Sequence, residues 1–369
     1  MFSKGYKYGH HPDYFLMAIV AILVVFGLAM LASASSNLGK IKFNDSYYYI
    51  KYQIYHGLVA GGIGFFLAYF LNYRRLKTFA IPLMLLGIVA LAMVFTGFGV
   101  TSGGATRWLA LGPISFQPSE IIKLTFIIYL AAWLSNPRMK REMSLGEGLI
   151  PFLIISGFIA ALLFMQPATS TVAIILGAAV IMYIYSGTSV KNILAVLFLG
   201  TVAFALIIGS TPYRRNRILG YFRSETDSLG QNYQINQALN AIGSGGITGV
   251  GYGDSIIKTS RLPAPLDDSI FAVIAEELGF VGAGSLVVLF ALLTFRMFWL
   301  ARKMRDRFGQ LILVGFGTIV TSQAIVNMGA ISGMMPLTGI PLPFISFGGT
   351  ALAVFLTMMG ISVNISKYT

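Results

Sequence analysis

RLPAPLDDSIFAVIAEELGFVG, residues 261–282, joins a proline-rich loop end to an apolar run that carries four acidic residues. These are Asp267, Asp268, Glu276 and Glu277, whereas the whole chain has only 13 Asp and Glu in 369 residues. Carboxylates beside or inside hydrocarbon are costly, so a functional role is the first hypothesis for them. The competing interpretation is that an aspartate caps the helix that follows, a position that suits Asp. The residues alone leave both interpretations open.

The composition is that of a polytopic membrane protein. The chain is 56% hydrophobic and 11% charged, whereas soluble domains are about 25% charged. It has no cysteine, which excludes disulfides and thiolate metal sites. Its three histidines are His10, His11 and His56, and two of them lie in a polar tail, so a His-based metal centre is not expected. The net charge of +13 indicates membrane topology and anionic lipid rather than a nucleic acid partner.

Ten apolar segments approach the length of about 20 residues that a spanning helix requires. They cover residues 13–35, 51–71, 77–97, 117–135, 149–166, 170–187, 191–209, 270–298, 309–332 and 344–365. Lys and Arg gather in the connections on the side of the two termini, so the positive-inside rule places both termini in the cytoplasm. The sequence therefore predicts an all-α membrane protein of about ten transmembrane helices, with residues 1–369 as a single membrane domain.

One connection is much longer than the others. Residues 210–269 form a predicted extracytoplasmic loop between the seventh and eighth helices, and loops of this length are usually functional. The loop contains a basic cluster at Arg214, Arg215 and Arg217. It continues with QINQALNAIGSGGITGVGYGD, residues 234–254, whose first part has helical spacing. The glycines of its second part allow tight turns or a close approach of two backbones.

The fourth predicted helix opens with polar residues at Gln117, Ser119 and Glu120. Lys123 follows one turn later, and Arg107 lies in the short loop before the helix. Glu120 and Lys123 are three residues apart and would form an ion pair on a helix. Alternatively, Arg107 and Lys123 present two positive charges at the membrane mouth, which would suit a phosphate group. The spacing favours neither alternative.

Three other segments carry polar, glycine or proline residues for which the sequence predicts a structural or a functional role. On a continuous helix, Asp268 and Glu276 would share one face, with Glu277 about 100° round. For the two glutamates we favour a buried structural ion pair, with Lys123 or Arg107 as the partner, over catalysis. QPATST, residues 166–171, is typical of a tight turn. Residues 327–352 are dense in Gly and Pro, and non-helical backbone at membrane depth is tolerated only where it is buried or lines a cavity.

Motifs along nearly the whole chain resemble the SEDS family (shape, elongation, division and sporulation), which includes FtsW, RodA and SpoVE. The matching motifs, in order, are GATRW, FQPSEIIKL, the QP turn, YQINQALNAIGSGG, DSIFAVIAEELGFVG and the run from Asn327 through Gly339, Ser346 and Gly349 to Ala351. Within the family, PYRRNRI and GIPLPFISFGG are more similar to the division member FtsW than to the elongation member RodA.

The resemblance implies a peptidoglycan glycosyltransferase that polymerises lipid II on the outer face of the bacterial cytoplasmic membrane, in division or in elongation. It also implies partners: lipid II, the nascent glycan strand, a class B penicillin-binding protein and other divisome or elongasome membrane proteins. The essential aspartate of the family falls on Asp268, its loop arginine on Arg107 and its helix-four lysine on Lys123. The remaining substrate-binding candidates are Gln117, Ser119, Glu120, Glu276, Glu277 and Ser346.

The chemistry of sugar transfer fits these residues. Transfer from a polyprenyl diphosphate requires a general base for the acceptor hydroxyl, which we assign to Asp268. A carboxyl with a pKa near 3.9 is a weak base at neutral pH, so burial or the acidic neighbour should raise the pKa of Asp268. Arg107 and Lys123 would offset the charge of the leaving diphosphate.

Several questions stay open at the level of sequence. The chain departs from the family motifs at Ala168, Ala264, Leu266, Asp267 and Phe347. The sequence shows no metal ligand set, and a divalent cation, Mg²⁺ or Mn²⁺, is the candidate cofactor. A lipid II flippase and a non-catalytic scaffold of the division complex are the rival predictions. The unusual residues concentrate on the outer side, which favours chemistry there over a path across the membrane.

Overall fold

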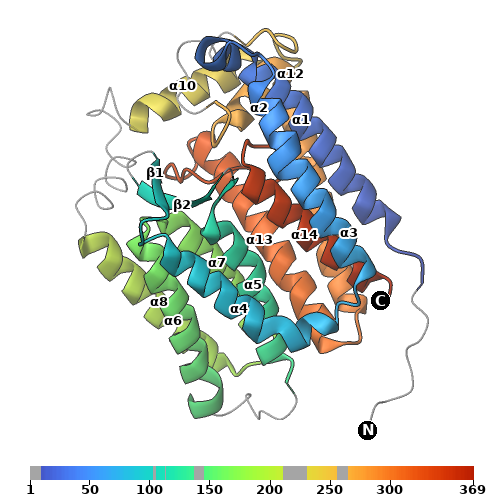
Figure 1. The fold of residues 1–369 in the computed structure, drawn as a ribbon, viewed down its shortest axis with the longest axis vertical. Coiled ribbons are helices and arrows are strands. Elements are labelled where there is room, and N and C mark those ends of the chain that lie inside the picture. Colours follow the sequence, from blue (N-terminus) through green and yellow to red (C-terminus); the bar gives the residue numbers. More distant parts are fainter. Residues whose placement is uncertain (1–9, 103–104, 113, 137–144, 211–230, 256–264) are drawn as a thin grey trace.

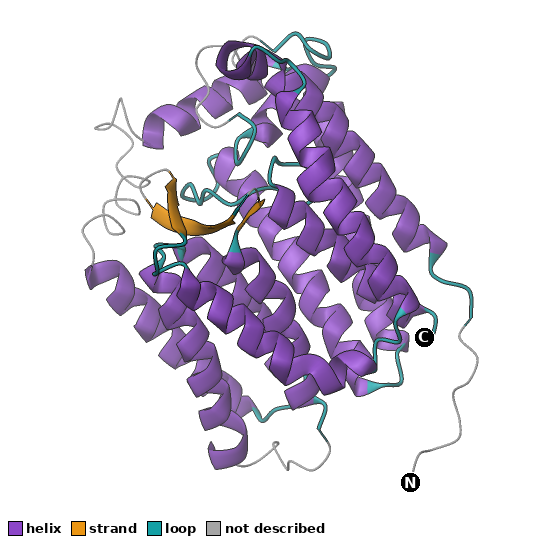
Figure 2. Ribbon diagram, in the orientation of Figure 1, coloured by secondary structure: helices purple, strands orange, loops and turns teal. Residues whose placement is uncertain are grey.

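The computed structural model describes residues 10–102, 105–112, 114–136, 145–210, 231–255 and 265–369 (Figure 1). Helices make up most of these residues (Figure 2). In chain order they are α1 (Tyr14–Phe43), α2 (Tyr48–Gln53), the π-helix η1 (Ile54–Val59), α3 (Ala60–Phe70), α4 (Arg75–Met93), α5 (Pro118–Leu134), the π-helix η2 (Leu145–Leu149), α6 (Ile150–Met165), α7 (Thr169–Tyr185), α8 (Val190–Ser210), α10 (Gln231–Ser244), α12 (Ile270–Lys303), α13 (Arg307–Ile331) and α14 (Gly349–Ser366).

Each of the ten predicted apolar segments coincides with a helix or with an uninterrupted series of helical segments. Among the described residues, six helical stretches are long and apolar enough to cross a membrane: α1, residues 48–70, α4, α12, α13 and α14. The helices α6, α7 and α8 are also apolar over shorter lengths. A helix satisfies its own backbone hydrogen bonds, which is why apolar spans take this form in lipid. The chain is therefore a multi-pass membrane protein.

The helix α13 forms the core of the bundle. It packs against α5, α7, α12 and α14, and every residue from Leu311 to Val320 is buried (Figure 1). A helix that is apolar on all sides is expected to be surrounded by other helices. The position of α13 matters for the site, because its buried polar residues Gln323 and Asn327 face neighbouring elements rather than lipid.

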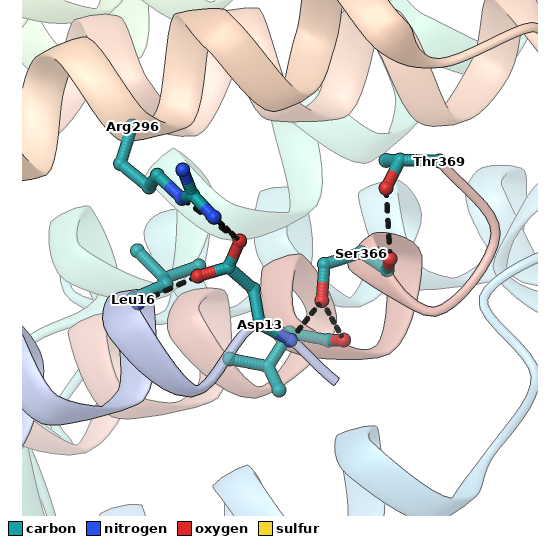
Figure 3. Close-up of polar contacts among 6 residues, drawn as sticks. Asp13, Leu16, Arg296, Ser366 and Thr369 are labelled. Atoms are coloured by element: carbon teal, nitrogen blue, oxygen red, sulfur yellow. Dashed lines mark hydrogen bonds and ion pairs between the residues drawn. The ribbon is translucent and has the colours of Figure 1, made fainter. Parts of the chain in front are cut away.

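The first and last described residues, His10 and Thr369, lie at one end of the bundle. The backbone N–H of His10 donates to the carbonyl of Lys367 at 2.7 Å, and the N–H of Asp13 donates to Ser366 Oγ at 3.0 Å. Arg296, in α12, pairs with the Asp13 carboxylate at 2.5 Å (Figure 3). We call this the termini end. The opposite end carries α10 (Figure 1), whose Gln234 side chain contacts Asp268, and we call it the Asp268 end.

A small sheet at the Asp268 end corrects the expectation of an all-α fold. Its strands are β1 (Gly99–Ser102), β2 (Ala105–Leu111) and β3 (Ile114–Phe116), and they are antiparallel in the order β1-β2-β3 (Figure 2). This region was expected to be only a short loop. Instead the strands satisfy their backbone groups against one another, and Leu109 of β2 is buried beneath them. Pro118 then begins α5, where its missing N–H is harmless.

Candidate functional site

Asp268 lies in the turn before α12, and not on the helix itself. The helix begins at Ile270, with Ser269 as its N-cap residue, so the predicted shared face of Asp268 and Glu276 is wrong. Asp268 is half-buried and Asp267 is exposed. Gln234 of α10 donates from Nε2 to Asp268 Oδ1 at 3.3 Å and to Ser269 Oγ at 2.9 Å. The predicted helix in QINQALNAI is present as α10, and its Gln234 side chain contacts the aspartate.

One side chain of the core helix α13 binds the backbone of Asp268 and the backbone of the connection between α13 and α14. Asn327 Nδ2 donates to the carbonyl of Asp268 at 2.9 Å and to the carbonyl of Ile340 at 2.7 Å. Next to Ile340, Gly339 has a φ of +64°, and a Cβ placed on it would lie 3.9 Å from Asp268 Oδ2. One amide thus holds Asp268 against the connection between α13 and α14.

That connection is residues 332–348, and it has the character predicted for the Gly- and Pro-rich stretch. It is not helical, and much of it is buried, including Ile340 and Ser346. The N–H of Phe347 donates to the carbonyl of Leu266 at 2.9 Å, which ties the connection to the turn before α12 a second time. The prediction that non-helical backbone here is enclosed by protein is confirmed.

Lys123 and Glu120 form a buried ion pair inside α5. The Nζ atom of Lys123 lies 2.7 Å from Glu120 Oε2, and the residues are 1% and 3% exposed. Lys123 also donates to Gln323 Oε1 at 2.8 Å, and Gln323 Nε2 donates to the carbonyl of Pro341 at 2.9 Å. The predicted pairing at three-residue spacing is confirmed. Lys123 thereby reaches the 332–348 connection through one glutamine.

Arg107 projects from β2 onto the QP turn. Its Nε donates to the carbonyl of Gln166 at 3.1 Å, and its Nη2 donates to the carbonyl of Pro167 at 2.6 Å. At the start of α7, Ser170 Oγ donates to the carbonyl of Thr338 at 3.0 Å. The arginine, the QP turn and the 332–348 connection are therefore joined in series, and the series ends beside Asp268. The tight turn expected at residues 166–171 is present.

The buried glutamates of α12 contact serines. Ser33 Oγ of α1 donates to both carboxylate oxygens of Glu277, at 2.6 and 2.7 Å, and Ser255 Oγ donates to Glu276. Both glutamates are almost fully buried. Pairing with Lys123, one of the two expected partners, is wrong, because that lysine binds Glu120 and Gln323.

A break in α12 lies directly after these glutamates. Gly279 has φ +64° and ψ −165°, and residues 246–251 pair with 276–281 across the break. The N–H groups of Val250 and Gly251 donate to the carbonyls of Glu276 and Glu277 at 3.0 and 3.1 Å. A Cβ on Gly279 would come within 2.3 Å of the Gly249 nitrogen. The predicted close backbone approach of the glycine-rich segment is confirmed.

Three further candidates lie in turns and helix starts at the Asp268 end. The N–H of Gln117 donates to Thr350 Oγ1 at 3.3 Å, which joins the start of α5 to the start of α14. Ser119 is buried in the first turn of α5. Ser346 Oγ accepts from the N–H of Leu342 at 2.7 Å, so this hydroxyl closes a turn in the 332–348 connection.

The acid pair has distinct electrostatics. Desolvation, then the charge of Asp268, raise the pKa of Asp267 to about 6, although Lys42 acts in the opposite direction. Asp267 keeps an accessible surface, and the surrounding protein nevertheless desolvates its carboxyl group. Two adjacent carboxylates disfavour double ionisation, so the pair holds a proton at a higher pH than an isolated aspartate would. This site is therefore suited to accepting or sharing a proton.

Sequence reasoning assigned no role to Gln234, Gln323 and Asn327. The last two lie one turn apart in the apolar helix α13, and they are 0% and 1% exposed. Polar residues inside membrane helices are a known signal of function or of structural pairing, and that signal was present. Gln234 could be found only from the structure, because α10 is remote in sequence from the turn that it covers.

Some predictions fall on residues beyond the described ones, among them the basic cluster at residues 214–217 and the departure at Ala264. The sequence showed no metal ligand set. Within the described ranges, no three His, Asp or Glu side chains gather closely enough to hold a metal ion.

Comparison with known sequences identifies relatives over the full length. The family model FtsW/RodA/SpoVE, described as cell cycle protein, matches residues 14–369. Stage V sporulation protein E of Bacillus subtilis (strain 168) is 34% identical over 364 residues, 97% of this chain and 98% of that protein. A probable peptidoglycan glycosyltransferase FtsW of Geobacter metallireducens is 33% identical over 366 residues, 99% of this chain and 97% of that protein.

Solved structures give the same result. A chain from a study of how a peptidoglycan synthase complex coordinates polymerization and crosslinking has a TM-score of 0.79 and 28% identity, over 97% of this chain and 99% of that chain. The rod shape determining protein RodA of Thermus thermophilus has a TM-score of 0.67 and 27% identity, over 96% of both chains. The chain belongs to the FtsW/RodA/SpoVE family of membrane proteins, which its own motifs already indicated.

Proposed function

We propose that this protein is a peptidoglycan glycosyltransferase that polymerises lipid II into glycan strands. Relatives that match almost the whole chain carry this activity in their names. The observation that carries the assignment to a site is the half-buried carboxylate of Asp268, which α10, α13 and the 332–348 connection hold in place. The motifs closest to FtsW and the names of the relatives support a role in cell division.

In the proposed reaction, Asp268 acts as the general base. It accepts the proton of the acceptor sugar's 4-hydroxyl while that oxygen bonds to the anomeric carbon of the lipid-linked donor. The bond from that carbon to the diphosphate breaks, and polyprenyl diphosphate leaves with the bonding electrons. A positioned base typically contributes a factor of about 10²–10⁴ to the rate. Asp267 assists by sharing the charge of the pair, since its pKa is already raised to about 6.

Arg107 is the residue that we assign to the departing diphosphate. Its bonds to the QP-turn carbonyls orient the guanidinium, and a planar guanidinium matches phosphate oxygens in a bidentate manner. Lys123 has a different position, because it is buried against Glu120. We assign Lys123, with Glu120 and Gln323, to supporting the 332–348 connection, and charge stabilisation at the reacting atoms to Arg107.

We further propose that the Asp268 end faces the outside of the bacterial cytoplasmic membrane and that both termini are cytoplasmic. A class B penicillin-binding protein is the proposed partner, supported by the similarity to a chain of a peptidoglycan synthase complex. We also propose that other divisome or elongasome membrane proteins contact this chain. The partner would cross-link the strands that this chain produces.

The test is polymerisation by purified protein. Full-length chain and its penicillin-binding partner are mixed with externally supplied lipid II, and glycan length is measured on gels, with Mg²⁺ and Mn²⁺ added or chelated in parallel. A polymerase produces strands in detergent, where no membrane separates two compartments. A flippase or a scaffold produces none there. Lipid II movement across vesicles without any polymerisation in detergent would overturn the assignment in favour of the flippase.

A further inference from the structure

A pocket of about 330 Å³ opens at the termini end, on the opposite side of the bundle from Asp268. Three separate segments line it: residues 10–14, the last two turns of α12 and the end of α14. Pockets for small ligands usually have volumes of about 300–1,000 Å³, so this one is large enough for a polar headgroup. The proposed reaction uses none of its residues.

The frame of this pocket is fixed by one buried aspartate. Asp13 caps α1 by accepting from the N–H of Leu16 at 2.8 Å (Figure 3). The same carboxylate accepts from Arg296 Nε at 2.8 Å, and its own backbone N–H donates to Ser366 Oγ at 3.0 Å (Figure 3). Asp13 therefore holds the start of α1, Arg296 of α12 and the end of α14 together, so the pocket is preorganised.

The charged side chains that line the pocket are Asp13, Arg296 and Lys303, and together they carry one net positive charge. The Asp13 carboxylate and the Arg296 guanidinium offset one another. Lys303 adds a further positive charge, with its Nζ 3.6 Å from the centre of the Trp299 ring, and His10 and His11 add polar groups. Among the residues that the structure describes, Lys303 makes no salt bridge. An anion is the ligand that this charge would attract.

The surroundings place the pocket at the boundary of the hydrocarbon. Tyr14 and Phe15 are exposed beside it and Trp299 is part of its wall, an arrangement typical of the aromatic belt at a membrane interface. Towards the Asp268 end, α1 and α12 pack together and expose apolar side chains that would face lipid. These include Ile22, Val25, Val288 and Phe295.

We propose that this pocket binds the phosphate of an anionic phospholipid in the leaflet at the termini end. The phosphate would lie beside Lys303, and the acyl chains would lie along the apolar face of α1 and α12. A free phosphate is also an anion, but it would gain nothing from that apolar face. The continuity of a cationic pocket with exposed hydrocarbon-facing side chains therefore points to a lipid.

The test uses the purified full-length chain and native mass spectrometry. Dioleoylphosphatidylglycerol, dioleoylphosphatidylcholine and inorganic phosphate are titrated separately. Phosphatidylglycerol is expected to bind most tightly. Lys303→Gln should weaken its binding about fivefold, the effect typical of one basic residue near anionic lipid. Lys303→Arg should retain it. Arg302→Gln is the matched control, because Arg302 is the adjacent exposed cation and does not line the pocket.

Three results would overturn the proposal. Equal affinity for the two lipids on the wild-type chain would show that the pocket does not select an anion. Equal losses in Lys303→Gln and Arg302→Gln would indicate general surface charge rather than a site. Binding of inorganic phosphate as tightly as phosphatidylglycerol would make free phosphate the ligand. The first and third comparisons use only wild-type protein, so they do not depend on how the variants fold.

Discussion

At the scale of single residues, the site depends on what its charged side chains contact. Asp268 is held by amides from two helices, Gln234 and Asn327. Lys123 is neutralised by Glu120 within the same helix, away from water. The half-buried Asp268 carboxylate is thus separate from the ion pair that supports its surroundings, and each arrangement can be tested by itself.

Asp267 should affect stability in a pH-dependent way. Its pKa is raised from 3.8 to about 6 in the folded protein, so folding binds a proton and stability falls as the pH rises through this interval. Asp267→Asn should leave the melting temperature unchanged at pH 4 and raise it above pH 6. Asp45→Asn is the control with the opposite sign, because Lys51 lowers the pKa of Asp45. Thermal melts of wild type and both variants from pH 4 to 8 measure these shifts in melting temperature. If the melting temperatures of Asp267→Asn and wild type differ by the same amount at every pH, the prediction is contradicted.

The ion pair in α5 should behave as a buried unit. Lys123→Met leaves Glu120 buried without its partner, which typically costs about 3–5 kcal/mol in the free energy of unfolding. The double variant Glu120→Gln, Lys123→Met should recover most of that loss. Lys51→Met, which breaks the exposed pair with Asp45, should change the stability little, because solvent screens an exposed ion pair. A double variant as unstable as Lys123→Met, measured by chemical denaturation, would argue against a structural pairing.

At the scale of elements, the break in α12 determines where the chain before it lies. The segment from Ile270 to Leu278 packs into the bundle, whereas residues after Gly279 expose large apolar side chains such as Phe280 and Val281. Strand-like pairing with residues 246–251 stabilises the change of direction. The turn with Asp268 is consequently fixed at one end by α13 and at the other by this paired segment.

Glycine should be required at the break but not elsewhere in α12. Gly279→Ala places a side chain at φ +64°, which costs about 1–3 kcal/mol in the free energy of unfolding, and the overlap with Gly249 and Ile247 adds to this. Gly284→Ala is the control, because a Cβ there meets nothing within 4 Å and alanine favours a helix. Thermal melts should show a large loss only for Gly279→Ala. Equal melting temperatures would mean that the break is not needed.

The ten apolar helical segments could be predicted because each is a long apolar run, and length and hydropathy are local properties of the sequence. Three features were not predictable in this way. The strands of residues 99–116 depend on pairing between short segments, and the break at Gly279 depends on a partner segment about 30 residues earlier in the chain. The position of Asp268 in the turn before α12, and not on a face shared with Glu276, depends on the contacts of Leu266 and Asp268 with the 332–348 connection and α13.

At the scale of the whole molecule, the sequence predicted Asp268 and Arg107 as one site, and the structure links them through the QP turn and the 332–348 connection. Arg107 contacts the QP turn, and Ser170 and Thr338 continue the connection towards Gly339. Their roles in the reaction stay predictions. The network of Gln323 and Asn327 that joins α5, α13 and the turn before α12 required the fold, because its members are distant in sequence.

The orientation of the bundle can be measured directly, because the natural chain contains no cysteine. Asp254→Cys lies exposed at the Asp268 end, and Arg302→Cys lies exposed at the termini end. In intact bacteria, after removal of any outer envelope barrier, a membrane-impermeant maleimide should label the first variant. It should label the second only after permeabilisation. Labelling in the reverse order would place Asp268 in the cytoplasm and contradict the proposed site of polymerisation.

The most direct test of the central claim is the polymerisation rate of Asp268→Asn, measured with purified protein, its penicillin-binding partner and lipid II. Asparagine preserves the size of the side chain and the contact with Gln234 but removes the base. We predict a wild-type melting temperature and a rate at least about 100-fold lower, while Asp254→Asn, an exposed aspartate at the same end, stays fully active. Glycan synthesis at the wild-type rate by a folded Asp268→Asn protein would contradict the claim.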